Sequence, residues 1–362
     1  LLAHCLDFLE EADMLDAVYQ AGFQYKNGAA FERDGKRTEY NFGDKFSEGY
    51  AYTFQVQRAT FDKILADEAE RQGVTIHYQH EITSADFTGT SPFLSVRGPD
   101  GEIRKWTARF VLDASGFGRT LPRMLDLETP SNFPVRRAVF THVEDHIDSS
   151  DMDRQKILVT VHPIKHDIWF WTIPFSNGRC SIGAVASTVQ FNAYPGTPEQ
   201  QLKTLISEVP NLSKVMRGAI YDTPINELNG YSANVKSMHG NGYALLGNAA
   251  EFLDPVFSSG VTIAMRSASL AAKVLTKHLN GEPVDWDAEF SIPLKKGVNT
   301  FRTYVNGWYD GRFQSVIFSN QQQDRIRSMI ASILAGYAWD SSNPFVAESE
   351  RRLQNVYELC KE

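Results

Sequence analysis

The segment between residues 247 and 261 carries the residues best suited to hold an electron-rich group. An apolar run before it predicts a buried strand that ends in a tight turn at Gly247. Ser259 and Gly260 then open a long helix, whose first backbone N–H groups lack partners within the helix and attract anions and carbonyl oxygens. Asp254, in the rigid loop between them, suits a hydroxyl partner. An ordinary strand–loop–helix with a serine N-cap would show the same pattern, and the residues alone leave both interpretations open.

A second candidate is the strand-like run Trp169-Phe-Trp171-Thr-Ile173-Pro174. Two tryptophans spaced by two residues on a strand lie on the same face of its sheet. Together they could form a flat wall that keeps an organic substrate away from a reactive group. An aromatic-rich core strand would carry the same residues.

The third candidate is Lys26, in the stretch Gly22-Phe-Gln-Tyr-Lys26-Asn-Gly28. Burial can lower the pKa of a lysine enough to make its amine a nucleophile near neutral pH. The alternative is a solvated lysine in a turn before Asn-Gly.

Composition narrows the classes of protein that can present these residues. The chain has 362 residues and a net charge of −8, without a basic cluster, so a nucleic-acid partner is not expected. Its three cysteines, Cys5, Cys180 and Cys360, show no CxxC spacing, and neither a disulfide framework nor a metal site is predicted. No stretch of 18 uncharged apolar residues occurs, so stable membrane insertion is not expected, and a cytoplasmic protein is the interpretation.

Several secondary-structure elements must position these residues. Apolar spacing predicts helices over 1–20, 60–72, 198–209 and 261–279, and a largely helical segment over 296–362. Short apolar runs predict strands at 74–78, 109–113, 157–161, 168–173, 180–186 and 243–247. The pattern indicates an α/β protein in which a nucleotide-binding domain is interleaved with an antiparallel β-sheet substrate domain, followed by a helical C-terminal segment. The predicted domains are 1–20, 53–125 and 236–295 for the first, 21–52 and 126–235 for the second, and 296–362 for the helices.

Three motifs occur in the order and with the spacing of a known superfamily. Gln55–Asp62, Leu112–Arg119 and Gly247–Val261 resemble the flavin motifs of the FAD-dependent aromatic hydroxylases and halogenases. The run Trp169–Pro174 matches the WxWxIP signature of the flavin-dependent halogenases at every fixed position. The resemblance implies an FAD-binding Rossmann-like domain and an enzyme that uses reduced FAD, O2 and halide to halogenate an electron-rich aromatic substrate.

The resemblance also implies roles for individual residues. Lys26 would be catalytic, Ser259 and Gly260 would bind halide, and an active-site wall would consist of Trp169, Trp171, Ile173 and Pro174. The residues that it implies for FAD are Gln55, Arg58, Asp113, Gly116, Gly247, Asn248, Asp254, Pro255, Gly260 and Val261. The implied partners are a halide, a separate flavin reductase and a small aromatic substrate, free or held on a carrier protein.

Two features depart from the family pattern. Phe257 stands where the tryptophan-specific enzymes carry a glutamate, which favours a phenol or pyrrole over free tryptophan. No GxGxxG fingerprint occurs in the 362 residues, so we expect an N-terminally truncated chain that binds FAD poorly. Two other hypotheses stay open: an FAD-dependent monooxygenase or dehydrogenase on the same scaffold, and a non-enzymatic flavoprotein remnant.

Overall fold

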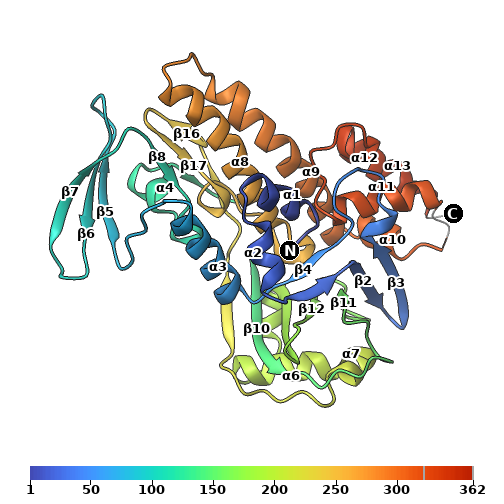
Figure 1. Cartoon of the computed structure of the whole chain (residues 1–362). Helices are drawn as coiled ribbons and strands as arrows, with labels where there is room; N and C mark the ends of the chain where they lie inside the picture. The colour runs from blue at the N-terminus through green and yellow to red at the C-terminus, as the bar shows by residue number, and fades with distance from the viewer. Residues whose placement is uncertain (321–322, 361–362) are drawn as a thin grey trace.

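Seven strands form the largest sheet in the computed structural model, which describes residues 1–320 and 323–360 (Figure 1). Their order across the sheet is β14-β10-β13-β12-β11-β2-β3. Neighbouring strands are antiparallel except β11 and β2, which run parallel. The strands are β2 (Gly28–Arg33), β3 (Lys36–Asn41), β10 (Arg136–Glu144), β11 (Lys156–Val161), β12 (Trp169–Pro174), β13 (Arg179–Ser187) and β14 (Asn226–Asn229).

The two faces of this sheet are buried against different helices. Alternate side chains of a strand point to opposite faces, so Val159 and Trp169 join one apolar cluster while Leu158 and Phe170 join another. The second cluster is closed by α6 (Pro198–Ser207) and α7 (Pro210–Val215), below the sheet in Figure 1. The first cluster extends into the helices of the C-terminal half.

A smaller sheet positions the predicted nucleotide motifs. Within it β8 (Val111–Asp113) and β17 (Tyr243–Leu245) run parallel, and β16 (His239–Gly240) adds an antiparallel edge. Helix α8 (Ser259–Leu279) follows β17 after a loop and packs against α1 (His4–Glu11), where Cys5 Sγ lies 3.1 Å from Thr262 Oγ1.

The remaining elements surround these two sheets. Helices α9 and α10 pack against one another, and the C-terminal helices gather at one end of the molecule (Figure 1). The helices are α2 (Leu15–Gln20), α3 (Arg58–Arg71), α4 (Thr120–Met124), α5 (Thr188–Asn192), α9 (Ile292–Tyr309), α10 (Arg312–Ile317), α11 (Asp324–Leu334), α12 (Pro344–Ala347) and α13 (Ser349–Leu359). The strands are β1 (Gln24–Lys26), β4 (Thr53–Gln55), β5 (Glu81–Asp86), β6 (Phe93–Arg97), β7 (Ile103–Thr107), β9 (Glu128–Thr129) and β15 (Asn234–Val235).

Two sequence predictions about these elements are wrong. Residues 74–78 form no strand, because Val74 and Tyr78 are more than half exposed and the chain gives them no pairing partner within its described residues. The helix predicted over 1–20 is broken into α1 and α2 by Asp13, whose φ of +55° is left-handed. The seven strands of the large sheet all fall within 21–52 and 126–235. In residues 1–320 and 323–360, no helix combines the length and the apolar character needed to cross a membrane.

Candidate functional site

The turn at Gly247 brings the end of β17 into direct contact with α8. Gly247 has a φ of +52°, and a Cβ there would lie 2.9 Å from the Cβ of Ala264 on α8. Its N–H donates to Ser267 Oγ over 3.0 Å, which fixes the turn to the helix. A glycine is therefore required both by the backbone conformation and by the close approach.

The start of α8 has no side-chain cap. Ser258 precedes the helix with a φ of +54°, and no side chain among residues 1–320 and 323–360 caps the first turn. Ser259 itself is buried and begins the helix. The N-cap residue is therefore a serine, Ser258 and not the predicted Ser259, and its side chain makes no capping hydrogen bond to the N–H groups of the first turn.

Asp113 and the turn after it lie beside this loop. The Asp113 carboxylate accepts hydrogen bonds from the N–H groups of Ser115 (2.7 Å) and Leu121 (2.8 Å), so it orders the turn that contains Gly116. The buried guanidinium of Arg119 donates to the carbonyl of Asn248 over 3.1 Å. Two of the predicted motifs thus meet at the carboxyl edge of the parallel pair β8–β17, where ligands bind in open α/β sheets.

The third motif is split between the interior and the surface. Gln55 is buried and donates from Nε2 to the carbonyl of Arg154 (2.8 Å), while its Oε1 has no hydrogen-bond partner in the described structure. Arg58 lies on the first turn of α3, exposed, and both of its bonds go to Asp62, at 2.8 and 2.9 Å. The structure therefore places Gln55, and not Arg58, among buried polar groups.

Lys26 is one of the most deeply buried side chains of the protein. It is 1% exposed, its Nζ donates to the carbonyl of Leu1 over 2.9 Å, and it lies 5.6 Å from the ring centre of Phe42. Burial lowers its pKa from 10.5 to about 7. Within the described chain no carboxylate pairs with it. The alternative of a solvated turn lysine is wrong.

The surroundings of Lys26 are polar on one side. Lys26 faces Thr53 across the β1–β4 pair, and Gln55 lies two residues further along the same face. All three side chains are buried, and in the described structure Thr53 Oγ1, like Gln55 Oε1, has no hydrogen-bond partner. Lys26 therefore lies across from two buried side chains that each have an oxygen without a partner in the described structure.

The two tryptophans of β12 form an aromatic surface, which we call the indole wall (Trp169 and Trp171). Their ring centres lie 6.0 Å apart at an interplanar angle of 50°. Trp169 is 1% exposed, and Trp171 is half-buried and donates to Ser181 Oγ over 3.0 Å. Ile173 packs on the same side, and Pro174 ends the strand.

Trp171 rests on a glycine of the neighbouring strand. Gly183 pairs with Trp171 across β12 and β13, and a Cβ at Gly183 would lie 2.3 Å from the indole Cζ2. We expect Gly183→Ala to displace the indole and to lower the free energy of unfolding by about 1–3 kcal/mol, the usual cost of overpacking. Urea titration measures the change. Gly43→Ala is the control, because a Cβ there meets nothing within 4 Å. Equal stabilities of the two variants would contradict the packing.

The indole wall is joined to the 247–258 loop by a hydrogen-bond chain. Trp169 Nε1 donates to Tyr309 Oη (3.0 Å), and Tyr309 donates to Asp254 Oδ2 (2.8 Å). Tyr231 donates to the same carboxylate oxygen over 3.3 Å, and Asp254 Oδ1 accepts the N–H of Val256 over 3.0 Å. Asp254 does accept hydroxyl groups, and in this structure they come from two tyrosines.

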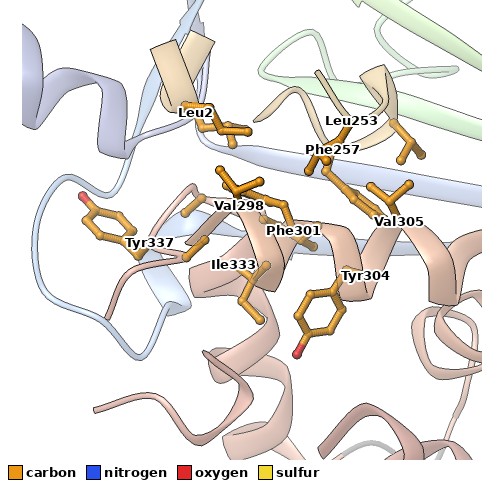
Figure 2. Packing of buried hydrophobic residues seen from close by; sticks show 14 of the residues in the cluster. Leu2, Leu253, Phe257, Val298, Phe301, Tyr304, Val305, Ile333 and Tyr337 are labelled. Carbon is orange, nitrogen blue, oxygen red and sulfur yellow. The ribbon is translucent and has the colours of Figure 1, made fainter. Parts of the chain in front are cut away.

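The motifs recognised in the sequence contain neither Tyr231 nor Tyr309. Their contacts with Asp254 span 23 and 55 residues of chain, and no local motif encodes such contacts. Phe257 is buried against Trp308 and Phe313, at ring distances of 5.8 and 5.4 Å. Figure 2 shows Phe257 and Leu253 packed over α9. The position that departs from the tryptophan-specific pattern is therefore part of an apolar core.

These features define an α/β protein in which two predicted motifs meet at the edge of the β8–β17 pair and an aromatic wall is hydrogen-bonded to the neighbouring loop. The family model described as tryptophan halogenase matches residues 13–355, and the chain belongs to this family, whose members use FAD. The chain is 23% identical to the 1H-pyrrole-2-carbonyl-[peptidyl-carrier protein] chlorinase of Pseudomonas fluorescens, with 95% of this chain and 82% of the chlorinase covered. It is 28% identical to the tryptophan 2-halogenase of Chondromyces crocatus over 74% of this chain, but it spans only 51% of that protein.

Solved structures share the whole fold. A flavoprotein/dehydrogenase from Cytophaga hutchinsonii is 40% identical, with a TM-score of 0.96 over 100% of this chain and 88% of that one. A myxobacterial chondrochloren halogenase, an FAD-dependent enzyme, is 26% identical, with a TM-score of 0.78 over 99% of this chain and 86% of that one. The predicted fold class, a mixed α/β fold with a helical C-terminal segment, is thereby confirmed.

Proposed function

We propose that this protein halogenates an electron-rich aromatic ring with Lys26 as its catalytic residue. The observation that carries the proposal is the burial of a lysine that has no carboxylate partner among the described residues and a pKa lowered to about 7, in a member of this family that also carries an indole wall. A lysine with this pKa is neutral in a large fraction of molecules at neutral pH, so its nitrogen lone pair is available.

The residues present fit FAD as the cofactor. The uncapped start of α8 offers N–H groups, and Gln55 Oε1 is a buried acceptor without a partner in the described chain. Asp113, Gly116 and Asn248 lie at the same edge of the β8–β17 pair. When bound, FAD supplies the activation of O2 that turns halide into hypohalous acid. Ser259 and Gly260 are the proposed halide position.

Lys26 would then transfer the halogen. In one route its neutral amine attacks the halogen of hypohalous acid, so that an N–halogen bond forms, the O–halogen bond breaks and water leaves. The ring carbon of the substrate next takes the halogen, loses a proton and regenerates the amine. In the other route the ammonium donates a hydrogen bond to hypohalous acid and makes the halogen more electrophilic. The unpartnered oxygens of Thr53 and Gln55 would hold the hypohalous acid beside Lys26 in either route.

The proposed substrate class follows from the reactivity of electrophilic halogen and from the substrates of related halogenases. Electrophilic halogen reacts with phenols, pyrroles and indoles, and Phe257, buried against other aromatic residues, cannot recognise the amine of a free amino acid. We therefore favour a phenol or a pyrrole, either free or held on a carrier protein like the substrate in the name of the chlorinase relative. A separate flavin reductase would provide reduced FAD.

A reaction with reduced FAD, O2, bromide and a panel of phenols, pyrroles and indoles tests the proposal. We expect mass spectrometry to detect a brominated product that requires both bromide and reduced FAD. A product that carries oxygen instead and forms without any halide would overturn halogenation.

A second candidate is an FAD-dependent monooxygenase or dehydrogenase. The observation that favours it is the 40% identical flavoprotein/dehydrogenase, which covers the whole chain. This function predicts that NAD(P)H is consumed in the absence of a reductase partner and that the product forms independently of halide.

A further inference from the structure

Tyr309 occupies a position that no motif marks. It is the last residue of α9, and its buried hydroxyl lies between the indole wall and the 247–258 loop, 3.0 Å from Trp169 Nε1 and 2.8 Å from Asp254 Oδ2. Its ring is also held from the side, because the guanidinium of Arg136 lies 3.4 Å from the ring centre. Arg136 in turn pairs with Asp167 over 2.7 Å.

The chemistry of the groups fixes the direction of the hydrogen bonds. An indole N–H can only donate, so the Tyr309 oxygen accepts it through a lone pair. The single hydroxyl hydrogen of Tyr309 is then directed at Asp254, a buried carboxylate that has only donors around it: Tyr309, Tyr231 and the N–H of Val256. Trp169 and Asp254 are thus joined through one hydroxyl group, that of Tyr309.

We propose that Tyr309 is a positioning residue that locks the indole of Trp169 to the 247–258 loop, so that the indole wall and the cofactor side of the site behave as one rigid unit. The proposal rests on the proposed function for its consequence: a wall that moves would let hypohalous acid escape before it reaches Lys26. The lock itself is a property of the fold and can be measured without any turnover.

The first test is hydrogen exchange of indole N–H groups, followed by NMR in protein labelled with ¹⁵N-tryptophan. The Trp169 signal is assigned by its disappearance in Trp169→Phe. In the unmodified protein we expect the Trp169 N–H to exchange far more slowly than that of Trp106, whose side chain is 37% exposed. Equal rates at the two sites would overturn the lock even if Tyr309→Phe cannot be purified.

The second test compares two tyrosines of the same helix. Tyr304 is fully buried in α9, and its hydroxyl donates to the carbonyl of Phe345 over 2.8 Å, away from the indole wall. Tyr309→Phe and Tyr304→Phe thus each remove a buried hydroxyl. We expect Tyr309→Phe to accelerate exchange at Trp169 at least about tenfold and Tyr304→Phe to leave it unchanged. Similar exchange in both variants would show that Tyr309 contributes stability alone.

A third measurement asks whether the lock matters for chemistry. During turnover, hypohalous acid that leaves the protein is trapped by a small diffusible enol, and the ratio of trapped halogen to halogenated substrate is recorded. We expect this ratio to rise severalfold in Tyr309→Phe and to stay unchanged in Tyr304→Phe. An unmodified protein that forms no halogenated product would refute the proposed function, while the exchange experiment would still decide on the lock.

Discussion

Lys26→Met is expected to reduce halogenation by at least about 100-fold, the lower end of what one positioned proton-transfer or nucleophilic group contributes. Methionine reproduces the unbranched chain as far as Cε but lacks the amine next to Thr53 and Gln55. Oxidation of reduced FAD by O2 should continue, because this substitution leaves the 247–258 loop intact. Product per turnover by mass spectrometry, together with O2 consumption, measures the two effects.

Lys156 provides the matched control for this experiment. It is buried like Lys26, at the start of β11, but its Nζ is paired with Asp153 over 2.8 Å and with Glu39 over 3.5 Å. We expect Lys156→Met to keep halogenation within about twofold of the unmodified protein, because the paired amine is not available as a nucleophile. Full activity of Lys26→Met would remove Lys26 from the mechanism, whatever the control shows.

The second large effect concerns the pH dependence of stability. Burial holds the Lys26 pKa at about 7 in the folded chain against 10.5 as its ordinary value, so between these values the unfolded chain binds a proton that the folded chain does not. Stability contributed by this site therefore rises with pH from about 7 to 10.5, by up to about 5 kcal/mol. Below about pH 7 the folded chain carries the full cost of a buried charge.

Lys26→Met removes the cost of burying a charged amine and should therefore raise the free energy of unfolding most below pH 7. We expect the gain over the unmodified protein to shrink steadily as the pH rises toward the ordinary pKa of lysine. Urea unfolding at several pH values between about 6 and 9, with the slope m held constant, measures the difference. A gain that is independent of pH would show that Lys26 is not buried in the way described.

Much of the scaffold could be predicted from the sequence because its signals are local. The indole wall lies on a strand whose bounds, Trp169–Pro174, coincide with the motif, and α8 starts at the predicted Ser259. The segment 74–78 is the exception, since an alternating apolar pattern forms a strand only where a partner strand and a covering layer exist. Whether such a segment pairs depends on its surroundings in the folded protein, and these are not encoded within the segment itself.

The candidate site was predictable only in its separate parts. The residue types of Lys26, Trp169 and Asp254 suggested their chemistry, but the burial of Lys26 depends on contacts with Leu1 and Phe42. The hydroxyl of Tyr309 contacts Trp169, which lies 140 positions earlier in the chain, and Asp254, which lies 55 positions earlier. Such long-range contacts are set by how α9 packs across the sheet, and their residues carry no sequence signal of their own.

The parallel pairing of β2 with β11 has a consequence for how the chain is made. Residues 28–33 leave the ribosome well before residues 156–161, and β2 is held between β11 on one side and β3 on the other. Until β11 arrives, the β2–β3 hairpin exposes an unpaired edge that bears Ala29, Ala30 and Phe31, which are all buried in the finished protein. We therefore expect nascent chains that end before β11 to be prone to aggregation. Closure of the long connection between β2 and β11 should also limit the rate of folding.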